Sequence, residues 1–199
     1  MIIRCVNENT TTVLYSYALY AEKYFNCESI IFHNKFHHAN NIDVITKFRN
    51  RFKCYTCENF NEIDNILKNE NIPYFYNTCG GNKNDTELVK NSVNLIHAVF
   101  TIEPFGDIYA GISSYIVNKS KFKTTPSIPY IVDLPISSEN MRNELNISAN
   151  SIVIGRYGGK EQFDIILAHN AIKTILEKDY NMYFIFANTN VFYTHPRII

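Results

Sequence analysis

The chain carries no net charge, because 19 Lys and Arg side chains balance 19 Asp and Glu side chains among its 199 residues. Surfaces that bind nucleic acid or anionic membranes show an excess of basic residues, so this composition favours neither function. The sequence also lacks an apolar run of membrane-spanning length and the charged, then apolar layout of a signal peptide. We therefore expect a cytoplasmic globular protein that has no transmembrane segment and binds no nucleic acid.

The five cysteines lack the even number and the spacing of a disulfide framework. Cys54 and Cys57 form a CxxC pair, but no second CxxC and no paired histidines follow to complete a zinc site. A structural role for the pair is favoured, and a redox pair is the alternative. His33, His37 and His38 are close in sequence, but no carboxylate or cysteine stands beside them. We expect these histidines in a solvated loop rather than around a metal.

Neither common phosphate-binding fingerprint, G-x-G-x-x-G or G-x-x-x-x-G-K-[ST], is present. The chain has instead a glycine-rich stretch at residues 151–164, SIVIGRYGGKEQFD. The β-branched run at 151–154 predicts a buried strand, and apolar residues at three- and four-residue steps predict a helix from Phe163. A glycine-rich loop that carries Arg156 and Lys160 would thus precede a helix N-terminus, which suits a phosphate. The alternative is a tight turn with two solvated cations.

Apolar periodicity predicts strands alternating with helices along most of the chain. The expected strands are at 2–6, 29–32, 53–56, 74–76, 94–100, 128–132, 151–154 and 183–187. The expected helices run from Thr10 or Thr11 to 25 and over 42–52, 61–69, 107–117 and 138–145, with a last one from 163. This alternation is typical of an α/β protein with a parallel sheet, whose carboxyl edge binds ligands.

Three positions near the expected sheet edges allow both a structural and a functional interpretation. His97, inside the apolar run NLIHAVF, is interpreted as a satisfied core residue, with a ligand role as the alternative. Gly80 and Gly81 follow a strand and form a turn or line a cleft. Asp107 is suited to cap the helix expected at 107–117, or alternatively to bind an acceptor hydroxyl or act as a base.

Several segments resemble, in the same order, the GT-B glycosyltransferases of group 1, in a family 4-like form. They are VNENTTTVLYSYALYAEKYF at 6–25, HAVF at 97–100 with PFGDIYAGIS at 104–113, IPYIVDLP at 128–135 and SIVIGRYGGKEQFDIILAHNAIKTILEKDYNMYFIFANT at 151–189. The resemblance implies a Rossmann-like doubly wound parallel sheet at 1–149, the acceptor-side domain. It implies that 150–199 is the first βαβ unit of an incomplete second Rossmann-like domain, which binds a nucleotide-sugar.

The resemblance also implies which residues carry the chemistry. The donor diphosphate would contact Gly155, Arg156, Gly158, Gly159 and Lys160, although the family's lysine stands one residue later, where this chain has Glu161. The acceptor-side loop would contain Asn9, Thr10, Thr11 and Gly106, and Asp107 would be catalytic. Phe105 replaces the family's histidine, so no histidine role is carried over.

The expected function is transfer of a sugar from a nucleotide-sugar to a glycan, lipid or protein acceptor. No metal and no cofactor other than the co-substrate is expected, in keeping with the absence of a D-x-D pair. A complete GT-B enzyme has two domains of ~100–200 residues each, so we expect this chain to be a fragment or to need a partner chain. The alternative is a non-catalytic Rossmann-like module that binds or assembles.

Overall fold

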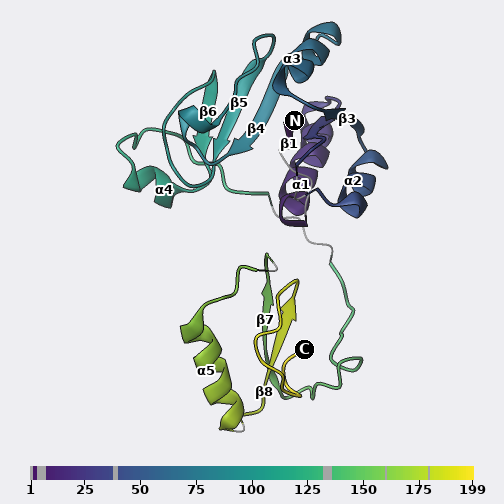
Figure 1. Cartoon of the computed structure of the whole chain (residues 1–199), viewed down its shortest axis with the longest axis vertical. Coiled ribbons are helices and arrows are strands. Elements are labelled where there is room, and N and C mark those ends of the chain that lie inside the picture. The colour runs from purple at the N-terminus through teal and green to yellow at the C-terminus, as the bar shows by residue number, and fades with distance from the viewer. Residues whose placement is uncertain (1, 4–7, 38–39, 132–135, 160, 179) are drawn as a thin grey trace. The chain divides into compact units, whose positions relative to one another are not determined.

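The computed structural model of the chain describes residues 2–3, 8–37, 40–131, 136–159, 161–178 and 180–199 (Figure 1). Contacts between Cα atoms divide the chain into two compact units, Met1–Leu134 and Pro135–Ile199, called unit 1 and unit 2 below. The division lies upstream of the boundary expected after residue 149, so the polar stretch at 146–150 belongs to unit 2.

Unit 1 is built on a six-stranded sheet with the order β3-β2-β1-β4-β5-β6. All its paired neighbours are parallel. The strands are β1 (Ile2–Ile3), β2 (Ile30–Asn34), β3 (Lys53–Cys57), β4 (Tyr74–Cys79), β5 (Val93–Ala98) and β6 (Ile108–Gly111). The strand order reverses between β1 and β4, and the two strands are paired directly, with Ile2 opposite Asn77. The expectation of an α/β chain with parallel strands is confirmed.

The helices of unit 1 are α1 (Glu8–Phe25), α2 (Ile42–Arg49), α3 (Phe60–Asn69) and α4 (Ser114–Lys119), with a short 3₁₀ turn at Lys83–Asp85. Helices α2, α3 and α4 begin where the sequence offers a capping side chain. The Asn41 side chain accepts from the backbone N–H groups of Asp43 and Val44, and the Asn59 side chain accepts from that of Glu62. Such caps satisfy N–H groups that have no partner within the helix.

Neighbouring residues of β2 face opposite sides of the sheet, as strand geometry requires. Ile31 belongs to a buried cluster with residues of α1 and α2, namely Leu14, Ala18, Val44, Ile45 and Phe48. Phe32 belongs to a cluster on the other face with Ile63 and Leu67 of α3, Phe75 of β4 and Cys57 of β3. The core of unit 1 therefore lies on both faces of the sheet, and helices cover both.

Unit 2 contains one parallel strand pair joined by a helix: β7 (Ile152–Tyr157), α5 (Ile166–Glu177) and β8 (Met182–Ala187). The register places Ile152 opposite Met182 and Tyr157 opposite Ala187. Its core is a cluster of Ile172 and Leu176 from α5 with Phe184 from β8. Residue Ile198 adds a parallel bridge to Phe184 at the other edge of β8. The predicted strand–helix–strand unit is thus confirmed.

Three expected elements are wrong. The segment expected as a helix at 107–117 begins with strand β6, and α4 follows only from Ser114, with Ser113 as its N-cap. The apolar residues at 108, 110 and 112 fit a two-residue repeat as well as a helical one, and pairing with β5 decides for the strand. Residues 128–131 form no strand, and the preceding Ser127 forms only an isolated bridge with Gly111. Residues 141–146 form turns rather than part of a helix at 138–145.

Several predicted boundaries also move. Helix α1 begins at Glu8, so Asn9, Thr10 and Thr11 lie in its first turn and not in a loop before it. His33 is buried in β2 rather than in a solvated loop. Strand β7 continues through Gly155 and Arg156 to Tyr157, and α5 starts at Ile166 instead of near Phe163. In the described ranges, no helix combines the length and apolarity needed to cross a membrane.

Candidate functional site

The strongest candidate site lies at the carboxyl end of β7, where two neighbours hold the Arg156 side chain. Its Nη1 donates to the Thr189 hydroxyl, which follows β8, at 2.6 Å. Its guanidinium carbon lies 4.9 Å from the centroid of the Phe163 ring, a cation–π contact. Arg156 is half-buried and forms no salt bridge within the described part of the chain. The Arg156 guanidinium is therefore oriented by its neighbours, but no carboxylate among the described residues neutralises its charge.

The two glycines after β7 allow the chain to pass close to this guanidinium. A Cβ atom at Gly158 would lie 2.6 Å from Nη2 of Arg156. The Asn188 side chain, which follows β8 with a φ of 52°, donates to the Gly158 carbonyl oxygen at 2.8 Å. A Cβ atom at Gly159 would lie 2.5 Å from the carboxamide carbon of Gln162. A side chain at position 158 would displace the guanidinium from this position, so glycine there permits the observed placement of Arg156.

Helix α5 begins beside this loop without a side-chain cap. Its N-cap residue is Ile165, whose side chain has no oxygen to accept from the first N–H groups of the helix. Unsatisfied N–H groups and the helix dipole together favour an anion at this end. A hollow of about 200 Å³ adjoins it, lined by Glu161, Phe163, Asp164, His169 and residues 189–192. Two carboxylates line the hollow, which disfavours an anion inside it.

The imidazole of His169 forms one wall of this hollow. It stacks on the Phe192 ring at 4.1 Å between centroids, with an angle of 10° between the planes. Its Nε2 is 2.6 Å from the Phe163 carbonyl oxygen, to which it donates. The hollow is thus lined by a stacked aromatic pair and by two carboxylates.

Of the five residues expected around the diphosphate, the structure brings Arg156, Gly158 and Gly159 together at this edge. Gly155 lies inside β7, paired with Ile185, and a Cβ atom there would meet nothing within 4 Å. Lys160 lies outside the described residues. The diphosphate role of all five stays a prediction.

Asp107 and Gly106 lie at the amino edge of the unit 1 sheet. Ligands of parallel sheets bind at the other edge, the carboxyl edge. Both residues immediately precede β6, which runs parallel to β5, so they lie at the amino ends of these strands. The Asp107 carboxylate accepts from the Asn94 backbone N–H at 2.7 Å and from its side-chain amide at 3.2 Å. These hydrogen bonds, the backbone one first, hold the Asp107 pKa below its usual value. The expected N-cap role is wrong, and the carboxylate stabilises the start of β5.

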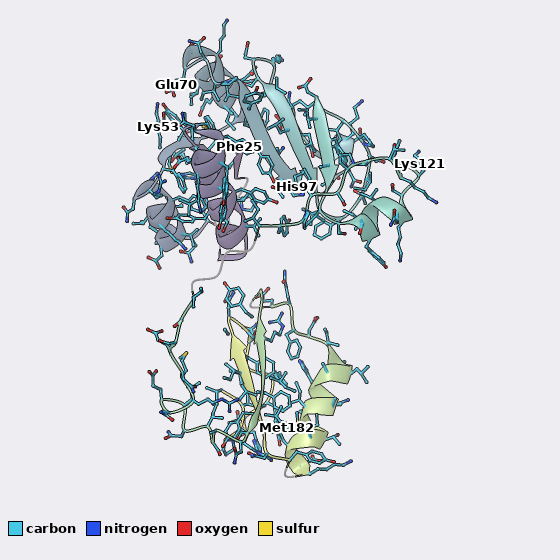
Figure 2. All side chains as sticks on the ribbon, turned by 180° about the vertical axis from the view of Figure 1, so that it is seen from behind. Phe25, Lys53, Glu70, His97, Lys121 and Met182 are labelled. Carbon is cyan, nitrogen blue, oxygen red and sulfur yellow. The ribbon has the colours of Figure 1, made fainter. Side chains whose placement is uncertain are left out.

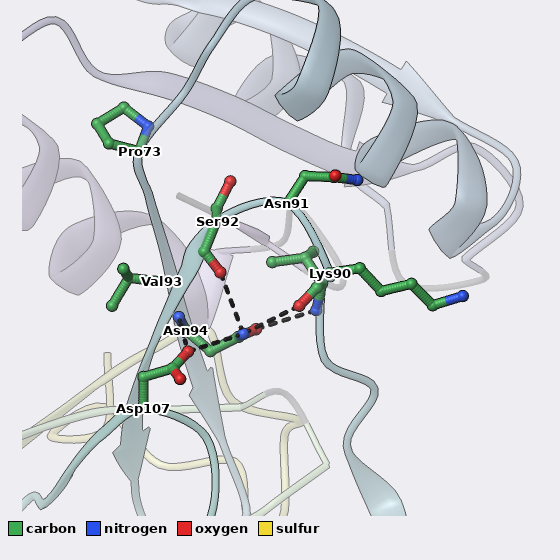
Figure 3. A pocket seen from close by; sticks show the side chains of 8 residues that line it. Pro73, Lys90, Asn91, Ser92, Val93, Asn94 and Asp107 are labelled. Atoms are coloured by element: carbon green, nitrogen blue, oxygen red, sulfur yellow. Dashed lines mark hydrogen bonds between the residues drawn. The ribbon is translucent and has the colours of Figure 1, made fainter.

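A hollow of about 390 Å³ lies beside Asp107, lined by Pro73, Asp107 and residues 89–94 (Figure 3). The Asn94 side chain there donates to the carbonyl oxygens of Val89 and Ser92, and its oxygen accepts from the Val89 N–H. In Figure 3 the Lys90 side chain points away from Asp107. The polar groups of Asn94 are therefore bound within the loop, and we attribute a structural role to this hollow.

The expected acceptor-side residues are divided between the two edges of the sheet. Asn9, Thr10 and Thr11 follow β1 and lie in α1, at the carboxyl edge, whereas Gly106 precedes β6 at the amino edge. A strand of five or six residues separates these edges by roughly 17–20 Å. The structure of unit 1 does not unite them in one site, and their acceptor role stays a prediction.

His97 is a satisfied core residue, as the favoured interpretation expected. It is 2% exposed, near the end of β5 (Figure 2). Its Nε2 lies 2.7 Å from the Ile128 carbonyl oxygen and must donate to it, so Nδ1 is the acceptor for the Tyr76 hydroxyl at 2.6 Å. Burial lowers the pKa of His97, which keeps this neutral tautomer.

Cys54 and Cys57 lie on opposite faces of β3. Cys54 packs with the cluster under α1 and α2, and Cys57 is buried in the cluster under α3. Three steps along a strand place their Cα atoms about 10 Å apart, beyond the reach of a disulfide. Burial raises the pKa of Cys54 and raises that of Cys57 to about 11. Among described residues no group of three or more His, Cys, Asp or Glu is placed to hold a metal.

We therefore expect Cys57 to resist alkylation in the native chain. At pH 8 iodoacetamide should modify the exposed Cys27 at least tenfold faster than Cys57, because the thiolate is the nucleophile and Cys57 is 2% exposed. Mass spectrometry of tryptic peptides after timed labelling measures both rates. Labelling in urea is the control, where the two rates should converge. A native Cys54–Cys57 disulfide would contradict the strand geometry.

Three residues of the unit 2 site were not predicted: Thr189, Asn188 and His169. Thr189 and Asn188 directly follow a strand that was predicted, and the carboxyl ends of parallel strands meet at one edge. That rule applied to both strands would have placed them beside Arg156. His169 gave no signal, because its contact to the Phe163 carbonyl depends on where α5 begins.

The comparisons with known proteins identify no family for this chain. Neither a scan against protein-family models nor searches among curated proteins and solved structures gave a match.

Proposed function

We propose that unit 2 binds the diphosphate of a nucleotide-sugar at the carboxyl end of β7, and that the chain is a GT-B glycosyltransferase or its N-terminal part. The observation that carries the proposal is the guanidinium of Arg156, which Thr189 and Phe163 orient while its Nη2 keeps no hydrogen-bond partner among the described residues. The uncapped N-terminus of α5 and the glycines 158 and 159 support it. The proposal that this ligand is a nucleotide-sugar rests on the sequence resemblance.

In this proposal Arg156 neutralises the negative charge that develops on the departing diphosphate, an electrostatic form of catalysis. A planar guanidinium grips two phosphate oxygens at once, which a lysine does not. Unit 1 would hold the glycan, lipid or protein acceptor in the cytoplasm. Asp107 is left out of the proposed chemistry, because its carboxylate accepts from Asn94 at the amino edge of the sheet.

A Rossmann-like doubly wound arrangement for unit 1 is part of the same proposal. The strand order β3-β2-β1-β4-β5-β6 and the helices on both faces support it. In such sheets ligands bind where the strand order reverses, here between β1 and β4.

A non-catalytic module that assembles with another protein is the second candidate. The apolar side chains of Ile152 and Ile154 on β7 are 59% and 44% exposed, although both belong to a strand. Exposed apolar strand residues favour a surface that a partner chain covers.

Calorimetric titration of the whole chain with UDP, GDP and their sugars tests the proposal. Replacing Arg156 by alanine should weaken nucleoside diphosphate binding roughly 10- to 100-fold, since hydrogen bonds to a charged group contribute about 1.5–3 kcal/mol. Lys178→Ala, which removes the same charge just after the far end of α5, should leave binding unchanged. Equal binding by Arg156→Ala, or no binding by the wild-type chain, would reject the diphosphate site.

A further inference from the structure

The hollow at the start of α5 has walls of two chemical kinds, aromatic rings and carboxylates. Its rings belong to Phe163, His169 and Phe192, and its carboxylates belong to Glu161 and Asp164. Residues 161–164 precede α5, His169 lies in it, and Phe192 follows β8, so the fold of unit 2 brings three separate segments together here. The diphosphate site proposed above uses neither carboxylate, and the hollow is left without a role.

The three rings contact one another and are held in place. The Phe163 ring centroid lies 5.1 Å from that of His169 and 5.5 Å from that of Phe192. The His169 backbone N–H donates to the Ile165 carbonyl at 3.0 Å, and its Nε2 donates to the Phe163 carbonyl at 2.6 Å. Phe186 of β8 packs edge-on against Phe192, with 5.2 Å between the centroids. The aromatic wall is thus formed in advance, so binding need not order these side chains.

The two carboxylates of the hollow are not neutralised by the protein. Within the described part of the chain, the side chains of Glu161 and Asp164 form no salt bridge and no hydrogen bond. The cation next to the hollow, Arg156, donates to the Thr189 hydroxyl instead. A positively charged ligand would therefore gain attraction to two carboxylates without breaking an existing ion pair.

The aromatic rings favour an organic cation over a metal ion. A hydrated metal ion would leave the rings without a partner, whereas an alkylated ammonium places its carbon atoms against the rings and its charge near the carboxylates. The Phe163 ring already has the Arg156 guanidinium 4.9 Å from its centroid, so this ring takes part in a cation–π contact in the structure itself. The volume of about 200 Å³ is smaller than the roughly 300–1,000 Å³ of pockets for drug-sized ligands, so it suits one small group.

We propose that this hollow binds a trimethylammonium group, such as that of choline. The rings of Phe163, His169 and Phe192 contact the methyl groups, and Glu161 and Asp164 compensate the charge. A trimethylammonium group has no N–H to donate, so it needs nearby negative charge but no acceptor in a fixed geometry, which suits two exposed carboxylates. The inference goes beyond the proposed function and does not depend on a diphosphate at Arg156.

Ligand-observed NMR on the whole chain tests the site with choline and with its uncharged isostere, 3,3-dimethylbutan-1-ol. Each probe gives one sharp methyl signal, so saturation-transfer titrations of the two compare directly. In about 0.15 M NaCl, which screens exposed charges beyond about 8 Å, the isostere should bind at least about fivefold more weakly than choline. Asp164→Asn should weaken choline binding about two- to fivefold, as expected for an exposed ion pair, and adding Glu161→Gln should weaken it further.

The matched control is Glu177→Gln, which removes the same charge at the other end of α5 and should leave choline binding unchanged. Phe192→Leu should weaken binding through the lost ring, and if this variant fails to fold, the exposed carboxylate variants still decide. Arg156→Ala should not weaken choline binding, which separates this site from the diphosphate site. Equal binding of choline and its isostere, no binding of choline, or an equal loss in Glu177→Gln would overturn the site.

Sedimentation with phosphatidylcholine vesicles shows whether the trimethylammonium group comes from a lipid or from a solute. Pelleting of the chain with the vesicles, reduced in Asp164→Asn, would assign the group to a lipid headgroup. A chain that binds choline but stays in the supernatant would assign it to a small solute. Pelleting that Asp164→Asn leaves unchanged, together with absent choline binding, would contradict the proposal.

Discussion

Replacing Phe75 with alanine is expected to lower the free energy of unfolding by about 3–5 kcal/mol, the usual cost of truncating a fully buried phenylalanine. Phe75 is 0% exposed at the centre of unit 1. Its ring centroid lies 5.8 Å from that of Phe60 and 6.4 Å from that of Phe32. Truncation loses the transfer free energy of the ring and leaves a cavity bounded by β2, β4 and α3. Domains of this size are stable by only about 5–15 kcal/mol, so the loss is a large fraction.

Urea titration followed by far-UV circular dichroism measures this change. Tyr74→Ala is the control, because Tyr74 is the neighbouring residue of β4 and is 60% exposed. Its removal should cost less than about 1 kcal/mol. A cost for Tyr74→Ala equal to that for Phe75→Ala would mean that β4 is paired in the other register, with the opposite face buried.

The interior of unit 1 was predictable from sequence because two signals agree there. The strands β2 to β5 are short apolar or aromatic runs, and α2 and α3 have both apolar periodicity and asparagine caps. Asn59 stands three residues before Glu62, a spacing typical of a helix start. Where local propensity and burial favour the same element, the sequence suffices.

The region after β5 was mispredicted because its sequence fits two periods. Ile108, Ala110 and Ile112 alternate, but Ile108 with Ile112 also satisfies a helical step of four. The deciding contact is tertiary, since Leu95 of β5 pairs with Ile108. Nothing local encodes a pairing partner thirteen residues away, and the consequence is large: Asp107 moves from a helix start to the amino edge of the sheet.

The sequence predicted the residue types of the candidate site better than it predicted their geometry. The run Gly155 to Gly159 correctly indicated a strand, a glycine-rich turn and a helix, in that order. It did not indicate that β7 extends to Tyr157, so Arg156 projects from the end of a strand rather than from a loop. Pairing with Phe186 of β8 extends the strand, and such pairing is again non-local.

Replacing Gly81 with alanine is expected to destabilise unit 1 by about 3 kcal/mol or more. Gly81 has a φ of 104°, which side-chain-bearing residues rarely adopt, and a Cβ atom there would lie 1.9 Å from the Thr101 carbonyl oxygen. The oxygen belongs to the backbone, and the Tyr109 hydroxyl lies 3.3 Å from it. The same hydroxyl is 3.2 Å from the Gly81 carbonyl. A clash with backbone would therefore disturb both loops at the carboxyl edge.

Gly80 supplies the matched control, since a Cβ atom there would meet nothing within 4 Å. Gly80→Ala should change the free energy of unfolding by less than about 1 kcal/mol in either direction, because it adds no contact and mainly restricts the unfolded chain. Urea titration of both variants gives the comparison. Equal stability of the two would show that the loop after β4 relaxes freely. A steric requirement would then not explain the glycine at position 81. The alternative, that Gly81 lines a ligand cleft, would become the better interpretation.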